Sequence, residues 1–242
     1  MTDQAMKEKH IVRSFDTELE AVQAHLMRMG GLVETGLSDA ITALRERDVH
    51  LAERTVKADR TIDELEELVK TEAANIIARR APTAVDLRVV LATFTIANQL
   101  ERSGDHAKNI AKRSITIAQS ASLDEVTAAI AHQAKMVQSM LAGALDAFMK
   151  RDPDAAQSIR ERDAEVDATY NTVFRTLLTH MMEDPANITP GMHLHFVAKN
   201  LERIGDHATG IAEQTIYLVS GELPDDDRPR RDQTPTETTE AR

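Results

Sequence analysis

Two stretches of this chain repeat almost the same octapeptide: Leu100-Glu101-Arg102-Ser103-Gly104-Asp105-His106-Ala107 and Leu201-Glu202-Arg203-Ile204-Gly205-Asp206-His207-Ala208. They differ only at their fourth residue. Each copy places one acid four residues before another, so on a helix the two carboxylates share a face. Because like charges repel, the repeated pair predicts a positive group between the oxygens. The repeat also predicts that the chain consists of two similar halves.

Aligning the halves extends the repeat beyond the octapeptides. At a constant offset of 104, Val33, Ala40, Ala43, Arg47, Asp48, Ala52, Asp59 and Asp63 match Val137, Ala144, Ala147, Arg151, Asp152, Ala156, Asp163 and Asp167. The octapeptides match at an offset of 101. The three-residue difference falls near a predicted helix connection, where changes in length are best tolerated.

The composition is typical of a helical protein. Hydrophobic residues make up 42% of the 242 residues, aromatics only 3%, and glycine and proline number nine and seven. Cysteine is absent, which excludes disulfides and thiolate metal ligands. No apolar stretch approaches the roughly 20 residues of a membrane span, and the first residues lack the apolar core of a signal peptide. We therefore expect a soluble cytoplasmic protein without a transmembrane segment.

The charge argues against nucleic-acid binding, because phosphate backbones are held mainly by Lys and Arg. The formal net charge is −11. Residues 221–242 hold seven acids and four arginines, so most of the negative charge lies on the rest of the chain. This tail, rich in Pro, Asp, Glu and Thr, is predicted to be disordered.

Apolar residues follow the helical period from about Arg13 to Ser220. The pattern predicts an all-α fold with helices near 13–46, 49–80, 84–119, 123–150, 153–182 and 190–220. The predicted caps are Asp48, Thr83 with Asp86, Ser122 with Glu125, Asp152 before Pro153, and Thr189 before Pro190. The predicted organisation is an N-terminal segment 1–12, two tandem three-helix bundles at 13–120 and 121–220, and the tail 221–242.

The alignment exposes a second acidic pair in each half. On a helical wheel both pairs border the apolar seam, so on antiparallel neighbouring helices four carboxylates converge at one bundle edge. The predicted metal ligands are Asp59, Asp63, Glu101 and Asp105 in the first half and Asp163, Asp167, Glu202 and Asp206 in the second. Such oxygen ligands suit Mg²⁺, Mn²⁺, Ca²⁺ or iron, and Zn²⁺ less well without cysteine. His106 and His207 point about 100° away from the acids and are not expected to ligate.

Other interpretations fit the same residues. Paired acids occur on many solvated helix faces, and the duplication could instead preserve ion pairs with Arg102, Arg203, Arg60 or Lys108. Gly104 and Gly205, within helices, indicate close helix approach. The methionines, including Met27, Met29, Met136, Met140, Met181 and Met182, are expected to fill the core rather than bind a partner. Because P-loop, zinc-protease and serine-hydrolase motifs are absent, a metal-dependent enzyme and a purely structural scaffold remain as alternatives to an adaptor.

The residues resemble the PhoU family of bacterial phosphate-uptake regulators. The resemblance rests on 13–19, 29–33, Asp59-Arg60-Thr61-Ile62-Asp63, 77–82, 86–88 and both octapeptides. It implies two three-helix bundles, with the eight acids above as the family's metal-binding signature, and it names no single metal. The expected occupants are divalent or trivalent ions, Mg, Mn, Fe or Zn.

The resemblance also implies a function and partners. It indicates a non-enzymatic accessory protein that restrains the phosphate-starvation response. The expected partners are the ATPase subunit of a phosphate ABC transporter, a sensor histidine kinase and a second copy of the chain. Association with the membrane would be peripheral, through these partners.

Overall fold

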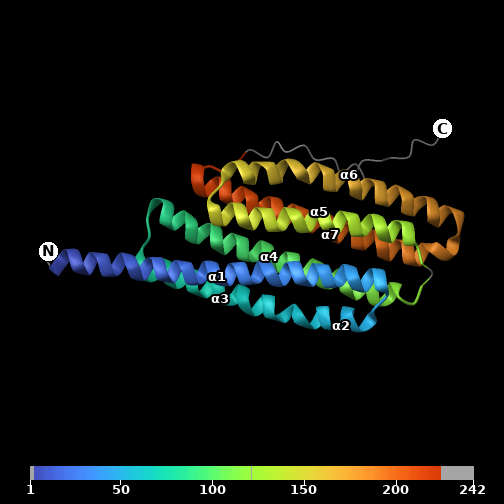
Figure 1. Cartoon of the computed structure of the whole chain (residues 1–242), viewed down its shortest axis with the longest axis horizontal. Coiled ribbons are helices and arrows are strands. Elements are labelled where there is room, and N and C mark those ends of the chain that lie inside the picture. The colour runs from blue at the N-terminus through green and yellow to red at the C-terminus, as the bar shows by residue number, and fades with distance from the viewer. Residues whose placement is uncertain (1–2, 121, 225–242) are drawn as a thin grey trace.

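The computed structural model describes residues 3–120 and 122–224, with side chains from residue 15 onward. Within these residues the secondary structure is helical (Figure 1). The elements are α1 (Asp3–Glu46), α2 (Val49–Ala58), α3 (Arg60–Arg80), α4 (Ala84–Ile117), α5 (Asp124–Lys150), α6 (Pro153–Glu183), a 3-10 turn η1 (Pro185–Asn187) and α7 (Ile188–Ser220).

The helices form the predicted pair of three-helix bundles. In the first, α1 packs against α3 and α4, and α2 continues into α3; in the second, α5, α6 and α7 pack together. The bundles lie side by side and meet through α4 against α7 and α1 against α5 (Figure 1). His106 on α4 contacts Asn200 on α7, and His207 contacts Gln99, so α4 and α7 run antiparallel.

The core is aliphatic. Fully buried Leu, Ile, Val and Ala side chains repeat at helical spacing on α1, α4, α5 and α7, as the apolar pattern predicted. Among the methionines, Met29 and Met140 are buried in this core, but Met182 is 85% exposed, so the expectation of core filling is wrong for Met182. It lies in the last turn of α6, where the helix pair ends and no further element covers it.

Helix boundaries differ from prediction at three places. The first helix begins at Asp3 rather than near Arg13. The second is interrupted at Asp59, although the backbone there stays in the right-handed helical region. The last begins at Ile188, because Asp184 caps a 3-10 turn that opens with Pro185 and leads directly into α7. The predicted disorder of the tail concerns mainly 225–242, which lie outside the described residues.

The structure confirms some of the predicted helix caps and not others. The Asp48 side chain accepts a hydrogen bond from Leu51 N, and Asp152 accepts from Asp154 N and Ala155 N, as expected. Thr83 makes no side-chain capping bond. The predicted Ser122 cap is wrong, because its hydroxyl donates to the Asp124 side chain and α5 starts after Leu123.

The end of α4 is held by an arginine from the first bundle. One Arg47 guanidinium nitrogen donates to the carbonyls of Ile117 and Ala118, at 3.1 and 3.0 Å, and to Ser120 O. Ile117 O also accepts a hydrogen bond from Ser120 N. The guanidinium adds a donor to these terminal carbonyls and complements the helix dipole. In the described residues, no helix is long and apolar enough to cross a membrane.

Candidate functional site

The first carboxylate cluster comprises Asp59, Asp63, Glu101 and Asp105. Asp59 occupies the break between α2 and α3, Asp63 lies one turn later on α3, and Glu101 and Asp105 face them from α4. Gly104 allows this approach, because a Cβ there would lie 3.0 Å from Ile62 Cδ1 and 3.1 Å from Asp59 Oδ1. The glycine within the octapeptide therefore brings the α4 backbone against an acid of the opposite helix, as the sequence predicted.

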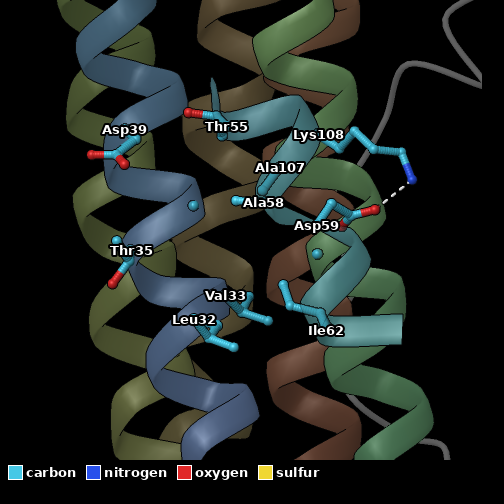
Figure 2. Close-up of a pocket in the computed structure, with 12 residues that line it drawn as sticks. Leu32, Val33, Thr35, Asp39, Thr55, Ala58, Asp59, Ile62, Ala107 and Lys108 are labelled. Carbon is cyan, nitrogen blue, oxygen red and sulfur yellow. Dashed lines mark hydrogen bonds and ion pairs between the residues drawn. The ribbon is translucent and has the colours of Figure 1, made fainter. Parts of the chain in front are cut away.

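Lys108 supplies a positive group to the first cluster. Its Nζ lies 2.5 Å from Asp59 Oδ2 and 2.6 Å from Asp105 Oδ1. Figure 2 shows this side chain reaching Asp59 at the edge of a small pocket that is also lined by Ile62 and Thr55. Asp59 is only 5% exposed, so its carboxylate depends on this partner. One of the ion pairs considered from the sequence is therefore present.

The remaining two acids of the first cluster carry raised pKa values. Burial raises the pKa of Asp63, and the neighbouring charges of Asp59 and Asp105 add to the effect while Lys108 opposes it. Burial likewise raises the pKa of Glu101, and the negative charges of Asp105 and Glu66 raise it further. Several carboxylates are thus close enough to repel one another, and one ammonium neutralises them only in part.

The second carboxylate cluster comprises Asp163, Asp167, Glu202 and Asp206. It is more deeply buried than the first, since Asp163, Asp167 and Glu202 are all less than a tenth exposed. Glu202 Oε1 accepts a hydrogen bond of 2.9 Å from Lys199 Nζ, whereas Oε2 is buried without a hydrogen-bond partner. Burial raises the pKa of Glu202 to about 7. The hydrogen bond from Lys199 lowers this pKa, and the negative charges of Asp206 and Asp167 raise it.

The lysines of the two clusters are not equivalent in the repeat. At the offset of 101, Lys108 corresponds to Thr209, and Lys199 corresponds to Asn98. The Thr209 hydroxyl is buried without a hydrogen-bond partner, and Asn98 Nδ2 lies 3.4 Å from Glu66 Oε1. Each half therefore neutralises the same set of acids with a lysine from a different position. The acids are duplicated, but their counter-charges are not.

The fit of these clusters to a metal ion is mixed. Their oxygens are the donors that Mg²⁺ and Mn²⁺ prefer, and Glu202 Oε2 is a buried oxygen without a hydrogen-bond partner. In the first cluster, however, the Lys108 ammonium lies where a cation would contact Asp59 and Asp105. Among the described residues, no three His, Asp or Glu side chains are arranged to hold a metal ion. Metal binding by the eight acids stays a prediction.

The octapeptide histidines have a role that the acidic pattern did not reveal. His106 and His207 stack across the contact between α4 and α7, with ring centroids 5.4 Å apart. Their Nδ1 atoms lie 2.8 Å from Asn200 Oδ1 and 2.6 Å from Gln99 Oε1, respectively. Gln99 and Asn200 also correspond at the offset of 101, so the arrangement is two-fold symmetric and joins the bundles.

The electrostatics of this histidine pair favour neutral rings. Burial lowers the pKa of both, and that of His207 to about 4, with His106, Arg102 and Arg203 adding to the effect on His207. The sequence carried one signal of this contact, namely an amide seven residues before each histidine.

Comparison with known proteins agrees with this architecture. The PhoU domain model matches the chain twice, at residues 26–114 and 130–215, once in each half. Two relatives carry the name phosphate-specific transport system accessory protein PhoU homolog. The protein from Rhizobium meliloti (strain 1021) is 44% identical over 231 residues, which cover 96% of this chain and 98% of the relative. That from Caulobacter vibrioides (strain NA1000 / CB15N) is 43% identical over 224 residues, covering 93% and 97%.

Solved structures give the same result. The crystal structure of PhoU from Pseudomonas aeruginosa is 41% identical, has a TM-score of 0.83, and covers 86% of this chain and 100% of its own. The phosphate transport system regulatory protein PhoU from Streptococcus pneumoniae is 30% identical with a TM-score of 0.81, covering 87% and 99%. With both halves matched by the domain model and nearly full-length relatives, the chain belongs to the PhoU family.

Proposed function

We propose that this protein is a non-enzymatic, cytoplasmic accessory protein of a phosphate transport system and a negative regulator of the phosphate-starvation response. The observation that carries the proposal is the nearly full-length similarity to proteins named as accessory to phosphate-specific transport. In this role it links the ATPase subunit of a phosphate ABC transporter to a sensor histidine kinase, and it reaches the membrane only through these partners. It acts as a homodimer.

The ionisable groups support an adaptor rather than a metal-dependent enzyme. Three carboxylates of the two clusters are engaged by lysines, Asp59 and Asp105 by Lys108 and Glu202 by Lys199. The Lys108–Asp59 pair joins α4 to the start of α3, which is a structural role rather than one in acid–base chemistry. The chemistry of the protein would then lie in what its helical surfaces bind.

A reporter assay tests the regulatory role. Deleting the gene in its own host should derepress a phosphate-starvation promoter in phosphate-rich medium, and a plasmid copy of the wild-type gene should restore repression. An unchanged reporter after deletion would contradict the regulatory assignment. Light scattering of the purified chain tests the homodimer, and a monomeric mass at micromolar concentration would exclude it.

We also propose that the two carboxylate clusters bind divalent or trivalent cations, of the kind Mg, Mn, Fe or Zn. The raised pKa values of Glu101 and Glu202 and the buried Glu202 Oε2, which has no hydrogen-bond partner, support this proposal. In the first cluster, binding requires Lys108 to leave Asp59 and Asp105. The ion would neutralise the carboxylates that face one another across two helices. It would thereby stabilise the helical surface that a partner binds.

A further inference from the structure

The surface near the turn between α6 and α7 carries an apolar patch. Several large apolar side chains are exposed there. On α6 they lie one turn apart, and on α7 they repeat at intervals of four residues. The apolar patch consists of Leu178, Met182, Ile188, Met192 and Phe196.

The exposed apolar side chains of α6 and those of α7 lie at the same level along the helix pair. The ring of Phe174, one turn before Leu178, lies 5.1 Å from the ring of His195. Closer to the turn, the Met181 side chain packs on Gly191, since an added Cβ there would lie 2.7 Å from Met181 Cε. Leu178 and Met192 fall between these two contacts, so the exposed side chains form one surface across both helices. Single exposed apolar residues are ordinary, but contiguous ones indicate an interaction site.

Arg113 of α4 gives this patch a charge. Its guanidinium carbon lies 4.2 Å from the centre of the Phe196 ring, and Nη1 lies 3.4 Å from His193 Nδ1. Nε is buried without a hydrogen-bond partner. Burial lowers the pKa of Arg113, but a guanidinium remains charged.

No carboxylate pairs with Arg113 among the described residues, in contrast to Arg80, which pairs with Glu18, and Arg160, which pairs with Glu213. Phe196 and His193 contact the guanidinium without neutralising its charge. A carboxylate supplied by a binding partner would complement it.

We propose that the apolar patch, with Arg113 at its edge, binds an amphipathic helix of a partner protein that carries an acidic residue beside its apolar stripe. An amphipathic helix presents apolar residues at intervals of three and four along one face, so it offers a stripe that can pack on the exposed apolar side chains of the patch. The two methionines can adjust to its side chains. One arginine and one aromatic ring offer too few donors for a free phosphate ion, which is normally held by several N–H groups. The inference rests on the proposed accessory role, because it assigns a surface to it.

A second copy of the chain is a poorer occupant. The patch and Arg113 together contain one cation and no acid. Docked patch to patch, as a two-fold dimer requires, each Arg113 would remain without a counter-charge. The homodimer of the proposed function would therefore use another surface.

Photo-crosslinking in the native host tests the proposal. A benzoylphenylalanine replaces Met192 in the full-length chain, and a control chain carries it instead of Arg54, which is exposed on α2. Mass spectrometry then identifies the crosslinked peptide. We expect position 192, and not position 54, to crosslink to an acidic, amphipathic helical segment of a phosphate-transport protein. A crosslink to another copy of this chain, to its own tail, to a basic segment, or to nothing would overturn the proposal.

Affinity measurements with the identified partner separate charge from folding. Arg113→Glu should weaken binding about tenfold or more, whereas Arg54→Glu, with the same change of charge, should change it less than about twofold. Met192→Ser, at an exposed site, should weaken binding without lowering the melting temperature. If transport proteins co-purify with the chain but the Arg113 and Met192 variants bind the partner as tightly as the wild type, the patch is not the binding site and the accessory role stands. If none co-purifies with the wild type, the accessory role and the patch both fail.

Discussion

Gly104 and Gly205 occupy the same position of the repeat but face different neighbours, so the same substitution should have different effects. A Cβ at Gly104 would lie 3.0 Å from Ile62 Cδ1 and 3.1 Å from Asp59 Oδ1. A Cβ at Gly205 would lie 3.5 Å from Val166 Cγ1, which is an ordinary contact. Asp59 cannot yield easily, because it is buried and paired with Lys108.

The magnitudes follow from two opposing effects. Replacing a mid-helix glycine by alanine stabilises a helix by about 1 kcal/mol, so Gly205→Ala should raise the free energy of unfolding by about that amount. At Gly104 the same gain is offset by overpacking, which costs about 1–3 kcal/mol. The two variants should therefore differ by roughly 1–3 kcal/mol, with Gly104→Ala neutral or destabilising.

Urea unfolding of the two full-length variants, followed by circular dichroism, measures this difference. Ile62→Val provides the control, because it removes the Cδ1 atom and should partly relieve the Gly104→Ala variant. Equal stabilisation by both alanine substitutions would refute the close approach of α4 to Asp59.

Three further predictions concern charged groups. Lys108→Met leaves Asp59 buried without its cation and should lower the free energy of unfolding at pH 7 by roughly 1–3 kcal/mol in urea titrations, the partial exposure of Lys108 reducing the effect. Arg47→Ala frees the carbonyls at the end of α4 and should speed amide hydrogen exchange at 118–120. The pKa of Glu202 is raised from 4.5 to about 7 on folding, so the folded state holds this proton more tightly than the unfolded state. The free energy of unfolding should therefore fall by about 3 kcal/mol as the pH rises from 4.5 to 8. Glu202→Gln should remove that fall, measured by urea titration at each pH.

Each of these has a matched comparison. Lys108→Arg should keep most of the stability that Lys108→Met loses. Arg151→Ala, at the repeat position of Arg47, should leave amide exchange at 118–120 unchanged, because among the described residues the Arg151 side chain donates to no carbonyl at the end of α4. A Glu202→Gln chain whose stability falls with pH as steeply as the wild type would contradict the assigned pKa.

The sequence predicted the fold because its signals are local. Helical periodicity and the Asp48 and Asp152 caps are readable from neighbouring residues, and the repeat is readable by comparing the two halves; all are confirmed. Where a second local signal competed, the prediction failed: Asp184 and Pro185 start a helical turn ahead of Thr189 and Pro190.

The sites were predictable only in part, because their contacts join distant helices. The acids could be found from spacing, but the pairing of Lys108 with Asp59 depends on how α3 packs on α4. The Lys199–Glu202 pair lies within α7 at i,i+3 and was missed because the repeat pattern compared only acids. The stacking of His106 on His207 likewise depends on the antiparallel register of α4 and α7. Arg113 gave no signal at all, since its neighbours His193 and Phe196 lie 80 or more residues away.

Metal analysis tests most directly whether the duplicated acids form cation sites. The purified chain and a Glu101→Gln/Asp105→Asn/Glu202→Gln/Asp206→Asn variant are each supplied with Mg, Mn, Fe or Zn, dialysed extensively and analysed for elements. We predict that the wild type retains at least about one metal ion per chain and that the variant retains only background. Negligible metal in both proteins would contradict the account and leave the lysine ion pairs as the sole purpose of the repeated acids.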